Sequence, residues 1–360
     1  MNFEFTDDQK AIGRTAKDFL EARYKLELVR ELAGDQRGFT DAQWDAIAEL
    51  GWPGVLIGED DGGLGLGVVE LVVIAEQLGY TLAPTPLLSS IAAGLLISAA
   101  GTPEQKQRWL PELASGEKRG AVAVWDQHGG WDPAHSELEL AAGALHATKI
   151  AVADADTADV LIVSGADGAH FLVERAADGI SVSAETPLDP TRKLYEVAFK
   201  GAPAEPLMSG QGGPIAHAYA AIAVALAAEN VGVAQRTMEM AVEYARERKQ
   251  FDRPIGSFQA VAHRCAQMLL ETEGARSLTY GAAWALDHDP KTGLRAASMA
   301  KSYAGDAGYR VAASSLQVHG GIGFTWEHNL HFFLKRGKAN AYAYGDSRWH
   351  RDRVITLAGV

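Results

Sequence analysis

The chain is poor in cysteine, and Cys265 is the single one in its 360 residues. A lone thiol excludes a disulfide within the chain and a metal site built from cysteines alone. We therefore expect a reducing compartment, the cytoplasm, and we expect Cys265 to be a small buried residue. No second histidine or cysteine stands at metal-binding spacing from His319, so no metal site is predicted.

Positive charge is also scarce, with 33 lysines and arginines against 46 acidic residues and a formal net charge of −13 at pH 7. Attraction to nucleic acid or to an anionic membrane surface is not expected of such a chain. The acidic residues are spread through helical stretches and form no tail. A local group of cations is therefore worth testing as a binding site.

The N-terminal segment has no basic region followed by an apolar one, so no signal peptide is expected. The most apolar window, residues 215–234, is interrupted by His217, Glu229 and Asn230. This pattern favours a buried helix over a membrane span.

Helix signals dominate the first third of the chain. Thr6 followed by Gln9 has the capping-box arrangement, Thr40 is a second N-cap candidate, and residues 51–67 form a glycine-dense loop. Apolar residues keep helical spacing over 70–78, 87–100 and 104–113. Residues 1–117 are therefore predicted to form an all-α domain.

The pattern changes after residue 117 to short apolar runs separated by Gly, Asp and Pro, which is typical of strands. We predict strands at 121–125, 150–153, 160–163, 170–173, 180–182 and 195–199. They are expected to form a compact antiparallel β domain over 118–205.

Long helical patterns return after residue 205. They cover 215–248, 258–286, 291–317 and about 330–357, and short connections join them. The sequence therefore predicts a four-helix bundle over 206–360, and a chain that is mainly α with a central β domain.

Residues 246–264 are the most distinctive stretch. A helix ends there in a group of cations and breaks at Asp252, Pro254 and Gly256, because proline cannot continue a helix. Arginines and glutamines at a bend offer forked donors to a planar anion such as a diphosphate ester. Residues 317–324 add two adjacent glycines, which let a backbone approach a ligand closely. From the residues alone, a solvated helix end stays an alternative.

These motifs, in this domain order, resemble those of the acyl-CoA dehydrogenases. The resemblance covers the whole chain and rests on residues 49–67, 246–259 and 317–324. It implies FAD as cofactor, an acyl-CoA thioester as substrate and an electron-transfer flavoprotein as partner. In that family a carboxylate removes the α-proton while the β-hydrogen passes to the flavin as hydride.

The resemblance also implies a role for the cationic bend. In the family this arm grips the ADP half of a flavin whose ring lies in a neighbouring subunit. Carried over residue by residue, the predicted cofactor-binding set is Arg248, Gln250, Phe251, Phe258, Gln259, Gln317, Gly320 and Gly321. Asp252 stands where the family usually has glycine, and His319 is expected to be a packed loop residue.

The catalytic base of the family is missing from both of its usual positions. Alignment with the family places Tyr344 at one position, and tyrosine, with a pKa near ~10, is a poor base. The other position falls on Ile222 and Ala223. The nearest carboxylates are Glu229 and Asp346, and ordinary ion pairs are expected for both, so no catalytic residue is assigned.

The flavin-facing part of the β domain also departs from the family. Residues 122–131 replace a Thr-Glu-Pro-type segment, and Ala151 and Ala153, after Lys149, replace an aromatic and a hydroxyl residue. A lost base with a retained ADP arm resembles the non-catalytic subunit of actinobacterial heterotetrameric enzymes that dehydrogenate steroid side-chain CoA thioesters. We therefore expect a second subunit that carries the base.

Three alternatives stay open from the sequence. The chain can be an active homotetramer that uses Asp346 as a displaced base, a flavin oxidase or monooxygenase, or a structural subunit without flavin. Alanines along 215–234 leave room for a bulky acyl chain but equally serve tight helix packing, so the acyl group stays open.

Overall fold

A computed structural model describes residues 5–127, 130, 136, 138, 140–208, 213–289 and 291–359. Contacts divide the chain into two compact units. Unit 1 comprises Met1–Arg30, Val68–Ala83 and Ala223–Val360, and unit 2 comprises Glu31–Gly67 and Pro84–Ile222. The predicted domain boundaries, at 117/118 and 205/206, were placed where the type of secondary structure changes, whereas the two units are defined by contacts. The boundaries therefore stay predictions.

The N-terminal third is helical, as the sequence predicts. Thr6 and Gln9 form a complete capping box at the start of the first helix, and Thr40 does the same with Gln43. One helix, α2, was not predicted from the sequence, because no capping side chain marks its start. The helices are α1 (Asp7–Arg23), α2 (Leu26–Gly34), α3 (Asp41–Ala48), α4 (Val68–Thr81), α5 (Leu87–Ala100) and α6 (Pro103–Ser115).

The described β region of unit 2 contains two sheets that share one hydrophobic core. One has the order β1 (Gly120–Ala123), β5 (Val160–Ser164), β6 (His170–Glu174) and β9 (Glu205–Pro206). The other has the order β2 (Trp125–Asp126), β4 (Ala144–Ala153), β8 (Leu194–Pro203) and β7 (Ile180–Ala184), and β3 (Leu140–Ala141) pairs with β4.

The expectation of a wholly antiparallel domain was wrong for one pair of strands. β1 and β5 run parallel, with Gly120 opposite Val160. The chain leaves β1 for the second sheet before it returns as β5, and parallel neighbours need such a long connection. Spacing along the sequence cannot reveal this direction.

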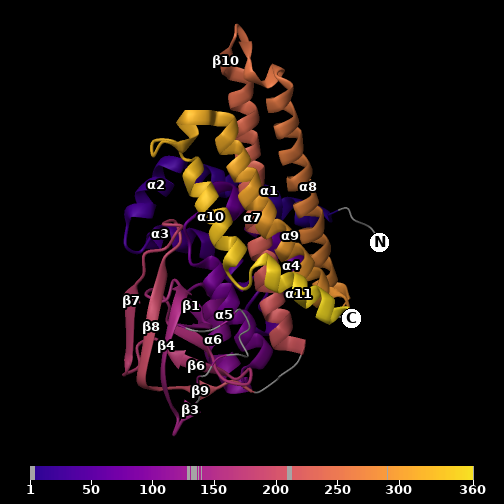
Figure 1. The fold of residues 1–360 in the computed structure, drawn as a ribbon. Helices are drawn as coiled ribbons and strands as arrows, with labels where there is room; N and C mark the ends of the chain where they lie inside the picture. Colours follow the sequence, from indigo (N-terminus) through magenta and orange to yellow (C-terminus); the bar gives the residue numbers. More distant parts are fainter. Residues whose placement is uncertain are drawn as a thin grey trace. The chain divides into compact units, whose positions relative to one another are not determined.

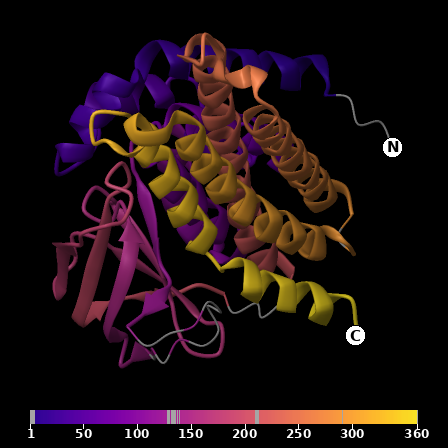
Figure 2. The same cartoon turned by 45° about the horizontal axis from the view of Figure 1, so that its top comes forward.

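Long helices follow: α7 (Gly213–Glu247), α8 (Gln259–His288), α9 (Gly293–His319), α10 (Leu330–Tyr342) and α11 (Ser347–Leu357). The helix α9 packs against α8, α10 and α11, and Figures 1 and 2 both show it beside α8 and α10. The apolar window of α7 is long enough to cross a membrane, but 78% of it is buried, as expected for a core helix.

The last predicted helix, 330–357, is in fact two helices. Tyr344 and Gly345 have positive φ angles of 57° and 108°, which end the helical path. Asp346 then begins α11, because its carboxylate accepts a hydrogen bond from the Trp349 backbone N–H at 2.8 Å. A glycine followed by an aspartate is a helix stop and start signal that could have revealed this break.

Buried polar groups hold the turn between α10 and α11. The Lys301 ammonium donates to the carbonyl oxygens of Ala341 (3.1 Å) and Gly345 (2.8 Å), and His350 Nε2 donates to the Tyr344 carbonyl (3.0 Å). Burial lowers the pKa of Lys301 to about 7. His350 Nδ1 is buried with no hydrogen-bond partner among the described residues, as suits a neutral ring.

In unit 1, the helices α4 and α7 cross at two glycines. A Cβ atom on Gly79 would lie 1.9 Å from the Glu229 carbonyl oxygen, and one on Gly232 would lie 1.9 Å from the Glu76 carbonyl oxygen. Real side chains do not tolerate such distances, so the crossing depends on the absence of both Cβ atoms.

We therefore expect Gly79→Ala to lower the free energy of unfolding by about 1–3 kcal/mol or more, because the two backbones must separate. Gly281→Ala is the matched control: this glycine lies inside α8, and its Cβ would meet nothing within 4 Å. The control should stabilise the protein by up to about 1 kcal/mol. Urea unfolding of the two variants measures this, and equal effects would contradict the close crossing.

A second prediction concerns pH. Burial, and then the charge of Lys301, lowers the pKa of His350 from 6.5 to about 3. The folded state thus binds this proton less well than the unfolded state, so the contribution of His350 to stability is complete above pH 6.5 and is lost as the pH falls toward 3.

Between pH 7 and pH 5, the free energy of unfolding of the wild type should fall by about 2 kcal/mol more than that of His350→Gln. Glutamine keeps a donor for the Tyr344 carbonyl but does not titrate. Denaturant titrations at the two pH values give the difference. Parallel pH dependences would show that His350 is not held neutral.

Candidate functional site

The predicted cationic bend is a β-hairpin between α7 and α8. Its strands, β10 (Lys249–Gln250) and β11 (Arg253–Pro254), pair antiparallel. Phe251 and Asp252 form the two-residue tip with φ angles of 54° and 62°, as a type I′ turn requires. Aspartate is among the residues that tolerate this conformation, so Asp252 can replace the usual glycine. Figure 1 shows the hairpin at the far end of α7 and α8.

The cations of the hairpin are exposed. Among the described residues, none of Arg248, Lys249 and Arg253 forms an ion pair. The Arg253 guanidinium lies 4.0 Å from the ring centroid of Phe258, whose ring meets that of Phe251 edge to face at 6.0 Å. Phe251 itself is 86% exposed. The hairpin therefore presents unpaired guanidinium donors beside aromatic surface.

The second motif lies at the C-terminal end of α9. Gly320 has φ 65° and ψ −142°, a conformation essentially restricted to glycine. It opens a 3-10 turn, Gly320–Phe324. Gln317 and Gly321 are exposed, and a Cβ on Gly321 would meet nothing within 4 Å. The backbone here is open to close approach by a ligand.

The two motifs meet at their bases. The ring of Tyr244, near the end of α7, stacks on the ring of His319 at 4.5 Å. Ile255 of the hairpin segment and Val318 of α9 belong to one hydrophobic cluster. His319 is buried and donates from Nδ1 to the Ser315 carbonyl at 2.8 Å, which confirms the expected packed histidine. Burial also lowers its pKa.

The side chains at these motifs suit a diphosphate ester. Arg248, Gln250 and Gln259 are exposed, and Gln259 is the first residue of α8, where unpaired backbone N–H groups favour an anion. The oxygens of a diphosphate accept hydrogen bonds readily from guanidinium and amide N–H groups. The predicted set from Arg248 to Gly321 thus lies on two segments that pack together, and its role in cofactor binding stays a prediction.

The described carboxylates near the base positions already have partners. Glu229 is buried, 3.3 Å from the guanidinium of the equally buried Arg336, which confirms the expected ion pair. Asp346 caps α11 where an ion pair was expected, although its charge also acts on the buried Lys301. The aligned base positions carry no carboxylate: Tyr344 stands in the α10–α11 turn, and Ile222 is buried in α7.

Part of the flavin-facing segment of the β domain lies outside the described residues, namely 128–129 and 131. Lys149 is fully buried: its ammonium contacts Asp126 at 2.8 Å, the Val124 carbonyl at 3.0 Å and Ser136 at 2.9 Å. Burial lowers the pKa of Lys149, and the Asp126 carboxylate opposes this shift. Ala151 has a positive φ of 52° at a bulge in β4.

Comparison with known proteins finds one family at both ends of the chain. The family model "Acyl-CoA dehydrogenase, N-terminal domain" matches residues 6–117, and "Acyl-CoA dehydrogenase, C-terminal domain" matches residues 218–356. The acyl-CoA dehydrogenase IpdE2 of Mycobacterium tuberculosis is 32% identical over 93% of this chain and 92% of its own length.

Solved structures agree with these matches. The ChsE4-ChsE5 complex from Mycobacterium tuberculosis contains a similar chain, with 28% identity, a TM-score of 0.90 and coverage of 100% of this chain and 99% of the other. The Tcur3481-Tcur3483 steroid ACAD gives 28% identity, a TM-score of 0.89 and 98% coverage of both chains. With domain models at both ends and relatives along its whole length, this chain belongs to the acyl-CoA dehydrogenase family.

Proposed function

We propose that this chain is a subunit of an FAD-dependent acyl-CoA dehydrogenase that contributes the ADP-binding arm, while a partner subunit carries the catalytic base. The proposal rests mainly on one observation: the described carboxylates nearest the aligned base positions already have partners. Glu229 is paired with Arg336 and Asp346 caps a helix, whereas the cations of the hairpin form no ion pair among the described residues.

The chemistry demands an unengaged base, and the described carboxylates nearest the aligned base positions, Glu229 and Asp346, both have other partners. Removal of a proton next to a thioester carbonyl needs an unengaged carboxylate aimed at the α-carbon. The carboxylate of Glu229 is directed at a guanidinium, and removing it from Arg336 would leave a buried charge alone, at a cost of about 3–5 kcal/mol. Tyr344 offers a phenol, which is ionised at neutral pH only when its pKa is strongly lowered.

The retained part is the ADP-binding arm. When bound, FAD supplies the acceptor for the hydride equivalent that leaves the β-carbon. In this proposal the guanidinium of Arg248 and the amides of Gln250, Gln259 and Gln317 hold its diphosphate and adenosine parts. The phenyl rings of Phe251 and Phe258 and the open backbone at Gly320 and Gly321 complete the surface.

The partners follow from the same reasoning. A flavin ring held by another subunit requires a heterotetramer or other association with a second acyl-CoA dehydrogenase chain, and the named ChsE4-ChsE5 and Tcur3481-Tcur3483 structures, each a pair of chains, support this arrangement. The steroid ACAD among them supports a bulky acyl-CoA as substrate. An electron-transfer flavoprotein would reoxidise the flavin, and cytoplasmic location remains part of the proposal.

The test compares the chain purified alone with the chain co-expressed with a homologous dehydrogenase subunit that has a glutamate at either base position. We expect the chain alone to be colourless, because in this proposal the flavin ring is held by the partner, and to be without dehydrogenase activity, because the partner carries the base. The co-expressed complex should be yellow and active with acyl-CoA. A yellow, active homotetramer of this chain would contradict the proposal.

Within the active complex, Arg248→Gln in this chain should weaken flavin retention by roughly tenfold or more, because one charge-assisted contact to the diphosphate is lost. Arg246→Gln is the control, since Arg246 lies in the last turn of α7 and outside the predicted set. Flavin absorbance after gel filtration reports retention, and the elution volume reports assembly. Equal flavin loss in both variants would exclude a specific role for Arg248.

A further inference from the structure

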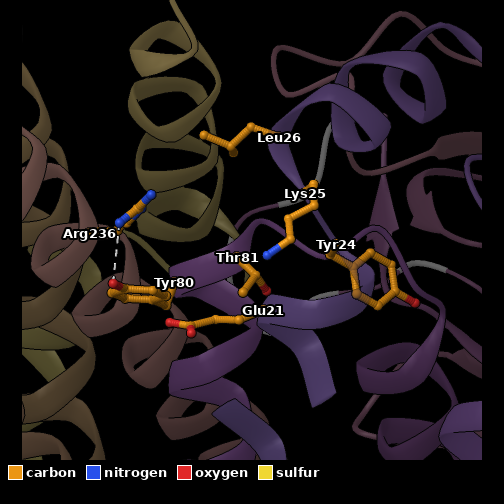
Figure 3. A pocket seen from close by; sticks show the side chains of 7 residues that line it. All are labelled: Glu21, Tyr24, Lys25, Leu26, Tyr80, Thr81 and Arg236. Carbon is orange, nitrogen blue, oxygen red and sulfur yellow. Dashed lines mark hydrogen bonds between the residues drawn. The ribbon is translucent and has the colours of Figure 1, made fainter. Parts of the chain in front are cut away.

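A separate pocket of about 220 Å³ lies within unit 1, between the α1–α2 junction, the end of α4 and the middle of α7 (Figure 3). We propose that it binds a small monocarboxylate, with Lys25 and Arg236 as the two cationic contacts. The pocket contains no residue of the hairpin or of the α10–α11 turn. The inference is therefore independent of the proposed function.

Arg236 is held in place by an aromatic wall. One of its terminal nitrogens donates to the Tyr80 hydroxyl at 3.3 Å, and its guanidinium lies 5.3 Å from the centroid of the same ring. The Tyr80 hydroxyl donates in turn to Glu239 at 2.6 Å. Arg236 forms no ion pair among the described residues, so its other N–H groups stay available to a ligand.

A partly buried network of hydrogen bonds and ion pairs supports this wall. Gln235 donates to Glu239 and accepts from Arg276 at 2.9 Å. Arg276 is paired with the buried Glu76 at 3.0 Å. These contacts join α4, α7 and α8, so the orientation of Tyr80 and Arg236 exists before any ligand arrives. Such preorganisation reduces the entropy cost of binding.

Lys25 provides the second cation from the opposite side. It follows Tyr24, which closes α1, and Figure 3 shows its side chain extending toward Thr81 of α4. No carboxylate pairs with Lys25 among the described residues, although Glu21 also lines the pocket. Two cations against one carboxylate leave a formal charge of +1 on the lining. A single negative charge on the ligand balances it.

Size and surface define the rest of the ligand. The volume of about 220 Å³ is below the range of roughly 300–1,000 Å³ for drug-sized ligands and above the ~150 Å³ that accepts benzene. The ring of Tyr80 and the side chain of Leu26 add apolar surface. Benzoate or a short branched alkanoate fits this combination. A phosphate dianion does not, because Glu21 would repel its second charge.

Isothermal titration calorimetry of the full chain with benzoate, isobutyrate and inorganic phosphate, at constant ionic strength, tests the proposal. We expect saturable binding of the carboxylates and weaker binding of phosphate. Lys25→Gln and Arg236→Gln should each weaken carboxylate binding tenfold or more, and Glu21→Gln should tighten it severalfold. Lys17→Gln, on α1 but outside the pocket, is the control and should change nothing.

Lys25 is exposed, so its variant keeps the test valid even where Arg236→Gln disturbs the wall. Thermal unfolding of each variant verifies the fold. The proposal fails if carboxylates show no saturable binding, if Lys25→Gln binds as well as the wild type, or if phosphate binds more tightly than benzoate.

Discussion

The buried ion pair between Glu229 and Arg336 constrains both the fold and the chemistry of this chain. It joins α7 to α10 at a point where both side chains are almost completely shielded from water. A charge in such surroundings is tolerated only with its partner, because either one alone would cost several kcal/mol. Glu229 is therefore committed to the structure of the bundle. A carboxylate in that position cannot also serve as an unengaged base.

The α10–α11 turn is also held by polar side chains whose partners lie within the protein. Lys301 and His350 hold its carbonyl groups, and Asp346 begins the helix that follows. The turn is thus fixed by groups that keep their hydrogen bonds inside the protein. The hairpin between α7 and α8 has the opposite character, since its cations are exposed and its tip is an aromatic ring. In an acidic chain, such an exposed cationic arm is suited to a ligand held together with another subunit.

Much of the fold could be predicted because its signals are local. Capping boxes at Thr6 and Thr40 mark helix starts, and short apolar runs separated by Gly, Asp and Pro mark the strands. The turn at Phe251 and Asp252 was expected from the break in the helix, but its hairpin geometry depends on two positive φ angles that non-glycine residues seldom adopt. The helix α2 and the break at Tyr344 were missed.

Non-local features could not be read in the same way. The parallel pairing of β1 with β5 depends on the route of the chain between the sheets. The partner of Glu229 stands 107 residues further along, and the Tyr80–Arg236 contact joins residues 156 positions apart. Single-sequence patterns report periodicity within an element and say nothing about which elements meet. The candidate site was predicted from the resemblance to a family. The structure then showed which groups the carboxylates of Glu229 and Asp346 contact.

The ratio of FAD to protein in the co-expressed complex tests the central claim most directly. Quantitative absorbance of the released flavin, with subunit masses from the same sample, gives this ratio. One FAD for each pair of unlike subunits is expected, because in the proposed arrangement this chain completes a site whose flavin ring lies in its partner. Two FAD molecules for each pair would show that this chain holds a flavin ring of its own, and would contradict the account.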